Sequence, residues 1–401
     1  MRRSALLRDN KGFSLVEMIV VMVIFIIVIM ITTDTFNAII SRSSGQTKSA
    51  QSNIEGIVGL EVLRADLDAI GFGLPWSFSD TIDPDYYVES QVGGTQMYVN
   101  GTGIDPSADF NDAPDSVPRA ILTKAAISGV RTGVDYLVIK STASAMSSAA
   151  KRWSYVSYSS TGGKIKQWGT SSDNLANGDR VITLNTTFST AGSVNRQLVV
   201  SGGSYSYRVN GVVAPTAYSP GDASQIFNVY GIRSESGALP ANEPLRMPFN
   251  RADYFIYRAS TIPQRCAPGT GSLYKAPINH SGGGYSGPYP LVDCVLDFQV
   301  VFVLDVDGNG NLTYTDSLAG MSAAEIRQQL KQVQAYLLAQ EGQKDRSFTY
   351  PGSSIVVAPA GLASLGNTWD DDMLTSTVGA DWKNYRWKIY EMAVQPRNLN
   401  N

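Results

Sequence analysis

The pattern of apolar and polar positions divides the chain into one long apolar segment near the N-terminus and a polar remainder. Residues 18–31 are apolar without a break, and the segment extends back to Phe13 with only Ser14 and Glu17 as polar interruptions. Because a helix rises about 1.5 Å per residue, this length crosses a hydrocarbon core of about 30 Å. The pattern predicts a transmembrane helix over residues 13–31.

A second periodic segment follows the membrane helix. Apolar residues recur at a 3-4-3 spacing that forms one stripe of a helix, at Leu60, Leu63, Leu67 and Ile70. The glycines and the proline of residues 71–75 end this pattern. We therefore expect the helix to continue to residue 71 and to pack its stripe on a domain that follows.

The remainder of the chain has the pattern of a β protein. Short β-branched and aromatic stretches alternate with Gly, Ser, Pro and Asn clusters, which is typical of antiparallel sheet. The predicted strands lie at residues 135–140, 153–158, 180–184, 205–209, 226–232, 254–258, 294–304 and 385–394. Ser322 and Glu325 have the spacing of a capping box that opens a short helix. Residues 333–340 fit both a helix and a strand.

Charge indicates the orientation of the anchor. Four bases precede the apolar segment against the single acid Asp9, namely Arg2, Arg3, Arg8 and Lys11. The positive-inside rule then keeps the N-terminus in the cytoplasm and exports the rest of the chain. The apolar run passes into polar residues 32–35 instead of the small residues of a signal-peptide cleavage site, so we expect the anchor to be retained.

Composition agrees with export and excludes one class of partner. The formal net charge is −3, from 32 bases and 35 acids, and removal of residues 1–12 takes away four bases and one acid, which leaves −6. This balance gives no sign of a nucleic-acid surface. The polar remainder is rich in Gly, Ser, Thr, Asn and Tyr with few charges, which suits an exported, turn-rich β protein.

Residues 12–17, Gly-Phe-Ser-Leu-Val-Glu, follow a short basic leader and open the apolar helix. This arrangement resembles the processing site of type IV prepilins and of the related pseudopilins of type II secretion. The resemblance implies that a prepilin peptidase cuts between Gly12 and Phe13 and methylates the new amino group of Phe13. It also implies an inner-membrane precursor with a periplasmic head, which later joins other pilins through its N-terminal helix at the cell surface.

Glu17 becomes the fifth residue of the mature chain under this resemblance. A carboxylate near one end of a membrane helix costs several kcal/mol unless it is paired or neutral. The first turn of a helix favours negative charge, and a free amino group at Phe13, on the same subunit or a neighbour, supplies a cation. We predict that Glu17 acts in assembly through this ion pair.

A narrower resemblance covers both ends of the exported part. Residues 63–73 resemble the end of the N-terminal helix of PilW-type minor pilins, residues 385–399 resemble their last strand and tail, and residues 295–310 also match. The resemblance favours a strand at residues 333–340. It implies an α+β fold, in which a long N-terminal helix carries a large, mostly antiparallel β head. The expected organisation is a leader at 1–12, a helix at 13–71 and a head at 76–401.

The predicted function is that of a minor pilin, placed at or near the pilus tip, where it primes or modulates assembly. Major pilins are much shorter and often carry cysteines near the C-terminus, whereas this chain has a large head that would obstruct neighbours in a tightly packed shaft. Two alternatives stay open. One is a type II secretion pseudopilin, and the other is a tip adhesin that uses the unmatched residues 76–250.

Cys266 and Cys294 are the only cysteines and lie in the exported part. An oxidising compartment favours a disulfide between them. Closure of this Gly/Pro-rich loop restricts the unfolded chain and should stabilise the folded protein by about 3 kcal/mol. The alternative is a pair of free buried thiols.

A calcium loop is a further prediction. Oxygen-bearing side chains stand at EF-hand positions 1, 3, 5 and 12, glycine stands at position 6, and position 7 offers its backbone carbonyl. These ligand positions are occupied by Asp305, Asp307, Asn309, Asn311 and Asp316. The match departs from the EF-hand because an aspartate replaces the usual glutamate at position 12 and a strand precedes the loop. A plain Asp/Asn/Gly turn accounts for the same residues.

We expect no enzyme activity. The single histidine, His280, leaves at most one candidate for a histidine-based triad or metal site, and its Gly-rich loop is expected to be an exposed turn. The acidic run at residues 370–372 is likewise expected to be a solvated turn.

Overall fold

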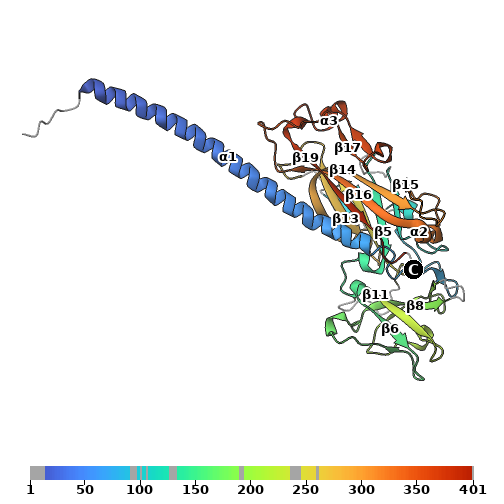
Figure 1. Cartoon of the computed structure of the whole chain (residues 1–401). Coiled ribbons are helices and arrows are strands. Elements are labelled where there is room, and N and C mark those ends of the chain that lie inside the picture. The colour runs from blue at the N-terminus through green and yellow to red at the C-terminus, as the bar shows by residue number, and fades with distance from the viewer. Residues whose placement is uncertain are drawn as a thin grey trace, which may run out of the picture.

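The computed structural model describes residues 14–90, 97–99, 102–104, 107–125, 133–188, 194–234, 245–258 and 262–399. A single long helix projects from a head built mostly of antiparallel strands (Figure 1). The predicted α+β class, with an apolar N-terminal helix followed by a large β-sheet region, is confirmed.

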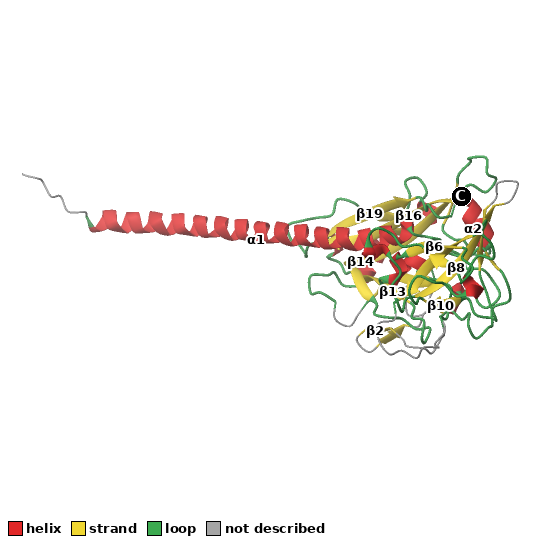
Figure 2. Ribbon diagram, turned by 90° about the horizontal axis from the view of Figure 1, so that it is seen from below, coloured by secondary structure: helices red, strands yellow, loops and turns green. Residues whose placement is uncertain are grey.

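Helix α1 (Leu15–Asp68) is 54 residues long and extends away from the head along most of its length (Figure 2). Its last turns carry the predicted stripe, since Leu63, Leu67 and Ile70 are buried in the main core. The helix ends where Gly71 takes a φ of +76°, a conformation that glycine adopts without steric cost.

The larger sheet has eight antiparallel strands within the described residues. Their order is β19-β16-β14-β13-β12-β5-β4, and β15 pairs with β14 off this path. The strands are β4 (Ile121–Lys124), β5 (Tyr136–Ser141), β12 (Asn250–Tyr257), β13 (Gly271–Pro277), β14 (Tyr289–Leu304), β15 (Thr313–Thr315), β16 (Leu330–Glu341) and β19 (Arg386–Val394). The ambiguous residues 333–340 therefore form a strand, as the resemblance favoured.

The smaller sheet has seven strands in the described part of the chain, and all seven lie within residues 76–250. Its order is β1-β9-β8-β11-β6-β7, with β10 paired to β8, and only β1 and β9 run parallel among these described pairs. The strands are β1 (Ser77–Phe78), β6 (Trp153–Ser157), β7 (Lys164–Ile165), β8 (Arg180–Phe188), β9 (Val194–Leu198), β10 (Ser206–Arg208) and β11 (Ile226–Arg233). In Figure 1 it lies below the larger sheet.

Short elements complete the head. Two hairpins form from β2 (Met97–Val99) with β3 (Thr102–Ile104) and from β17 (Ile355–Val357) with β18 (Asn367–Trp369). Helix α2 (Ala323–Gln329) begins with the predicted capping box of Ser322 and Glu325. The short 3₁₀ helices are Ala108–Phe110, Thr142–Ser144, Ala149–Lys151, Ser171–Asp173, Thr216–Tyr218, Ala363–Leu365 and Trp382–Asn384.

The acidic run at residues 370–372 opens helix α3 (Asp371–Thr377), so its prediction as a turn was wrong. Asp370 is the N-cap, because its carboxylate accepts a hydrogen bond from the Met373 amide at 2.8 Å. The two acids that follow lie in the first turn, where the helix dipole favours negative charge.

Both faces of the larger sheet are covered, because side chains alternate along its central strands. On one face, Phe298 and Val300 of β14 belong to the same core as Leu67 of α1. On the other face, Val301 of β14 and Leu338 of β16 pack in a second core with tryptophans from the segment after β16, at Trp369, Trp382 and Trp387.

Candidate functional site

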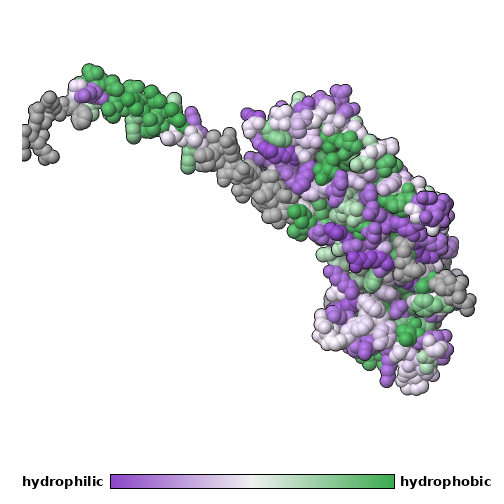
Figure 3. All heavy atoms as spheres, in the orientation of Figure 1, coloured by the Kyte–Doolittle hydropathy of each residue, from purple (hydrophilic) through white to green (hydrophobic). Residues whose placement is uncertain are grey.

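The N-terminal part of α1 is an apolar rod. Residues Leu15–Phe36 form a segment long and apolar enough to cross a membrane, and every residue in it is exposed. Figure 3 shows apolar residues along this end of the helix, in contrast to the mixed surface of the head. A surface of this kind is stable only in lipid or against other helices.

Glu17 begins this rod as part of a capping box. Its carboxylate accepts a hydrogen bond from the Ser14 amide at 2.9 Å, and the Ser14 hydroxyl accepts one from the Glu17 amide at 3.2 Å. The carboxylate therefore turns back toward the end of the chain that Phe13 would expose after cleavage. Gly12 and Phe13 themselves lie outside the described residues.

The other end of α1 is fixed tightly to the head. At Gly59 the helix approaches β14 so closely that an added Cβ would lie 2.0 Å from the Leu291 carbonyl oxygen. Near the C-terminus of the helix, the Asp66 carboxylate accepts a hydrogen bond from the Tyr254 hydroxyl and pairs with Lys275. Burial raises the pKa of Asp66, and the neighbouring Lys275 opposes that rise. The helix and the larger sheet are thus joined by a buried ion pair.

The N-terminus matches one family model. Residues 7–33 match the prokaryotic N-terminal methylation motif. The chain is type IV pilin-like at its N-terminus. No curated protein and no solved structure matches the chain.

The pilin motif carries general consequences for this chain. It implies interaction with other pilins and with the prepilin peptidase, and it suggests a structural protein. Together with the apolar helix, it fits a membrane-anchored pilin that later enters a pilus.

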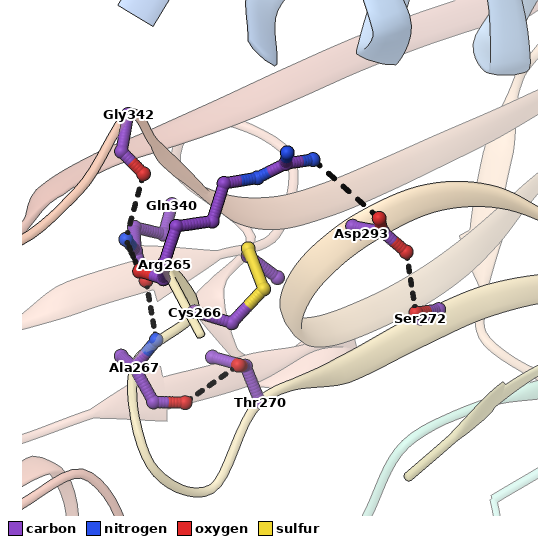
Figure 4. Close-up of a disulfide and its surroundings, with 9 residues drawn as sticks. Arg265, Cys266, Ala267, Thr270, Ser272, Asp293, Gln340 and Gly342 are labelled. Atoms are coloured by element: carbon purple, nitrogen blue, oxygen red, sulfur yellow. Dashed lines mark hydrogen bonds and ion pairs between the residues drawn. A yellow bond between two sulfur atoms is a disulfide. The ribbon is translucent and has the colours of Figure 1, made fainter. Parts of the chain in front are cut away.

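Cys266 and Cys294 form the predicted disulfide, across a sequence separation of 28 residues. Gln340 of β16 holds the loop before β13, because its side chain accepts a hydrogen bond from the Ala267 amide and donates to the Arg265 carbonyl (Figure 4). Arg265 also pairs with Asp293 at 3.5 Å. The disulfide therefore lies in a braced loop beside the second core.

The predicted calcium loop forms the end of a hairpin between β14 and β15. The Asp305 carboxylate accepts from the Gly310 amide at 3.3 Å, and Asn309 accepts from the Asn311 amide at 2.9 Å. Because Phe302 pairs with Thr315, Asp316 lies opposite Val301, about 13 Å along the hairpin from Asp305. Among the described residues, no group of three or more His, Cys, Asp or Glu side chains is placed to hold a metal ion.

The exposed turn expected at His280 was wrong. The ring is buried, and its Nε2 lies 3.0 Å from Oδ1 of Asn250. Asn250 donates through its amide nitrogen to the Thr142 and Ile232 carbonyls, so the histidine donates to the asparagine oxygen. Burial lowers the pKa of His280 to about 3, which keeps the ring neutral as a core residue.

A buried ion network in the head was missed by the sequence analysis. Lys140 of β5 pairs with Glu89 at 2.7 Å and with Asp112 at 2.5 Å, and Arg251 of β12 pairs with Asp253 at 2.8 Å. Burial alone would lower the pKa of Arg251, but the carboxylate of Asp253 raises it above its usual value. Loss of one partner from such a network costs about 3–5 kcal/mol.

Proposed function

We propose that the protein is a minor pilin of a type IV pilus. Before assembly it is anchored in the inner membrane with its head in the periplasm. It is then assembled at or near the pilus tip, where it primes or modulates assembly. The observation that carries this proposal is one continuous helix with two different surfaces. Its first part is exposed and apolar. Its last part packs closely on a large head at Gly59 and forms an ion pair with it through Asp66.

This arrangement suits a subunit that leaves the membrane as one body. The exposed rod is transferred from lipid to the helices of neighbouring subunits, a change that keeps its apolar surface out of water. The head follows because the buried Asp66–Lys275 pair and the close approach at Gly59 join it to the same helix.

Processing creates the assembly site in this proposal. Residues 1–12 are the leader, residues 13–71 form the mature helix and residues 76–401 form the head. Cleavage after Gly12 gives an amino group at Phe13, close in sequence to the carboxylate of Glu17, which turns back toward the Ser14 amide. Mass spectrometry of the protein recovered from fibres should find methylated Phe13 at the N-terminus, and recovery of an intact leader in fibres would contradict this step.

Deletion and complementation test the function. Cells that lack the protein should carry few surface pili, and the wild-type chain should restore them. Immunogold label against the head should mark fibre ends. Loss of protein secretion with normal piliation would instead identify a type II secretion pseudopilin, and label along entire shafts would exclude a tip subunit.

A further inference from the structure

A cleft of about 810 Å³ opens at the side of the smaller sheet, in the part of the head outside the resemblance to minor pilins. Its walls are the start of β6, the segment 146–152 that precedes it, and the loop 168–173 that follows β7. Clefts of this volume commonly accommodate small ligands. The cleft is also remote from the apolar part of α1, so it is separate from the assembly surface.

Two tryptophans provide the apolar wall of the cleft. Trp153 and Trp168 have ring centroids 5.4 Å apart at an interplanar angle of 61°. Trp153 is 41% exposed, although such a large ring is usually more buried. Tyr230 stacks behind Trp153 with its centroid at 6.5 Å, which supports the exposed ring from the core side.

The aromatic wall is held rigid by hydrogen bonds. Trp168 donates from Nε1 to the Trp153 carbonyl at 2.8 Å, and its amide donates to Oδ1 of Asn174 at 2.6 Å. Arg152 ties the far end of the same loop, because its Nε donates to the Ser172 carbonyl at 3.0 Å. A preformed wall loses little conformational entropy when a ligand binds.

The charges around the cleft balance. Arg152 is matched by the buried Asp179, whose carboxylate lies 3.2 Å from the guanidinium. Lys151 and Asp173 are both exposed and line the cleft with opposite signs. The remaining polar lining includes hydroxyls of Ser148, Thr170 and Ser172. A strongly anionic or cationic ligand finds no net complementary charge here, whereas a neutral ligand with many hydroxyl groups finds both donors and acceptors.

We infer that this cleft binds a neutral carbohydrate, with the apolar face of a pyranose ring stacked on Trp153 and its hydroxyls bonded to the polar lining. The C–H face of a pyranose is flat and weakly apolar, which matches an exposed indole, and the equatorial hydroxyls project toward the rim. Such binding adds a recognition function to the head and does not depend on the role in pilus assembly.

Isothermal titration calorimetry on the purified full chain tests the inference. The protein is kept in a polyoxyethylene detergent, because detergents with sugar headgroups would compete for the cleft. The probes are lactose, maltose and cellobiose as neutral disaccharides, a sulfated disaccharide as the anionic probe, and choline as the cationic probe. We expect saturable binding of at least one neutral disaccharide and weaker binding of the two charged probes.

Three variants complete the test. Trp153→Ala removes the stacking surface and should weaken binding about tenfold or more. Gly169→Gln fills the cleft without loss of any contact, since a Cβ on Gly169 meets nothing within 4 Å, and should weaken binding in a normally folded protein. Phe188→Ala removes an aromatic ring of the same sheet that is 75% exposed and lies outside the cleft, so it should bind as the wild type does.

The inference is overturned if none of the neutral disaccharides binds, if a charged probe binds more tightly, or if Trp153→Ala and Gly169→Gln both retain wild-type affinity. Piliation assays of the same variants separate the two proposals. A cleft variant that assembles pili normally but no longer binds sugar leaves the minor-pilin proposal intact.

Discussion

Glu17 contributes both a helix cap and a charge, and three substitutions separate these contributions. Glu17→Gln keeps a side chain that can complete the capping box but removes the charge. Ser14→Ala removes the hydroxyl that accepts from the Glu17 amide and keeps the charge. Glu17→Ala removes both contributions of Glu17.

We expect Glu17→Gln and Glu17→Ala to be cleaved normally but to enter fibres at least about tenfold less than wild type, because a desolvated ion pair is lost. Ser14→Ala should enter fibres. The measurement is the amount of each processed variant in sheared pili relative to membranes. Normal incorporation of Glu17→Gln would show that assembly does not require the charge, and a failure of Glu17→Ala beside it would assign the requirement to the cap.

Asp135 predicts a pH dependence of stability. It is buried, its carboxylate accepts from the Val300 amide at 2.7 Å, and burial raises its pKa to about 7, with Asp297 and Asp316 adding to the rise. Because the folded pKa lies above the unfolded value, the folded state holds the proton more tightly. This stabilisation is complete below about pH 4 and is lost as the pH rises to about 7.

Asp135→Asn should remove the contribution of this residue to the change of unfolding free energy with pH. The wild type is expected to lose about 3 kcal/mol of unfolding free energy from this residue between about pH 5 and pH 8. The amide still accepts from Val300, so the variant should unfold at a higher temperature than the wild type at the higher pH. Asp109→Asn is the control, since Asp109 is exposed. Equal slopes for Asp135→Asn and wild type would contradict the assignment.

At the scale of elements, two glycines one turn apart on α1 predict opposite effects. An alanine at Gly59 would place its Cβ against the Leu291 backbone, so Gly59→Ala should destabilise the head by about 1–3 kcal/mol. An alanine at Gly56 would meet the Tyr390 hydroxyl at 3.5 Å, an ordinary contact, so Gly56→Ala should gain up to about 1 kcal/mol of helix propensity. Thermal unfolding measures both, and a Gly59→Ala variant that gains stability as Gly56→Ala does would refute the close approach.

Calcium binding at the β14–β15 hairpin stays a prediction at this scale. Since Asp316 lies away from the hairpin end, an ion there would rely on Asp305, Asp307 and Asn309 and would bind with the modest affinity of extracellular sites, about millimolar. Calcium should then raise the melting temperature, and the double variant Asp305→Ala with Asp307→Ala should lose that increment. Identical melting curves in calcium and in chelator would leave a plain Asp/Asn/Gly turn.

Elements that are determined by residues close together in the sequence could be predicted. The stripe of α1, the strand segments and the Ser322 cap depend on period and capping, which act within a few residues. The order of the strands could not be predicted, because the pairing of β5 with β12 joins segments more than a hundred residues apart. The burial of His280 and Lys140 was missed for the same reason: their partners come from distant segments that no spacing identifies. Arg251 pairs with Asp253 on its own strand, but its guanidinium also donates to Asn111 and to the Ser107 carbonyl, which lie more than a hundred residues earlier.

The whole molecule combines a narrow helix with a head that is much broader than the helix in both views (Figures 1 and 2). A filament that packs its subunits through parallel helices gives each internal head only the space left by its neighbours. Because the head contains the smaller sheet as well as the larger one, it occupies more volume than the larger sheet alone would. A subunit at the end of the filament has no neighbour beyond it and escapes this restriction.

This geometry predicts a fixed, small number of copies in each fibre. Quantitative mass spectrometry of sheared pili should find this chain far below the major subunit, and its ratio to the major subunit should fall as the fibres become longer. The physical reason is that added length comes from subunits with small heads, while the ends stay constant in number. A ratio that is independent of fibre length would mean that the large head fits within the shaft, and the tip location would then be wrong.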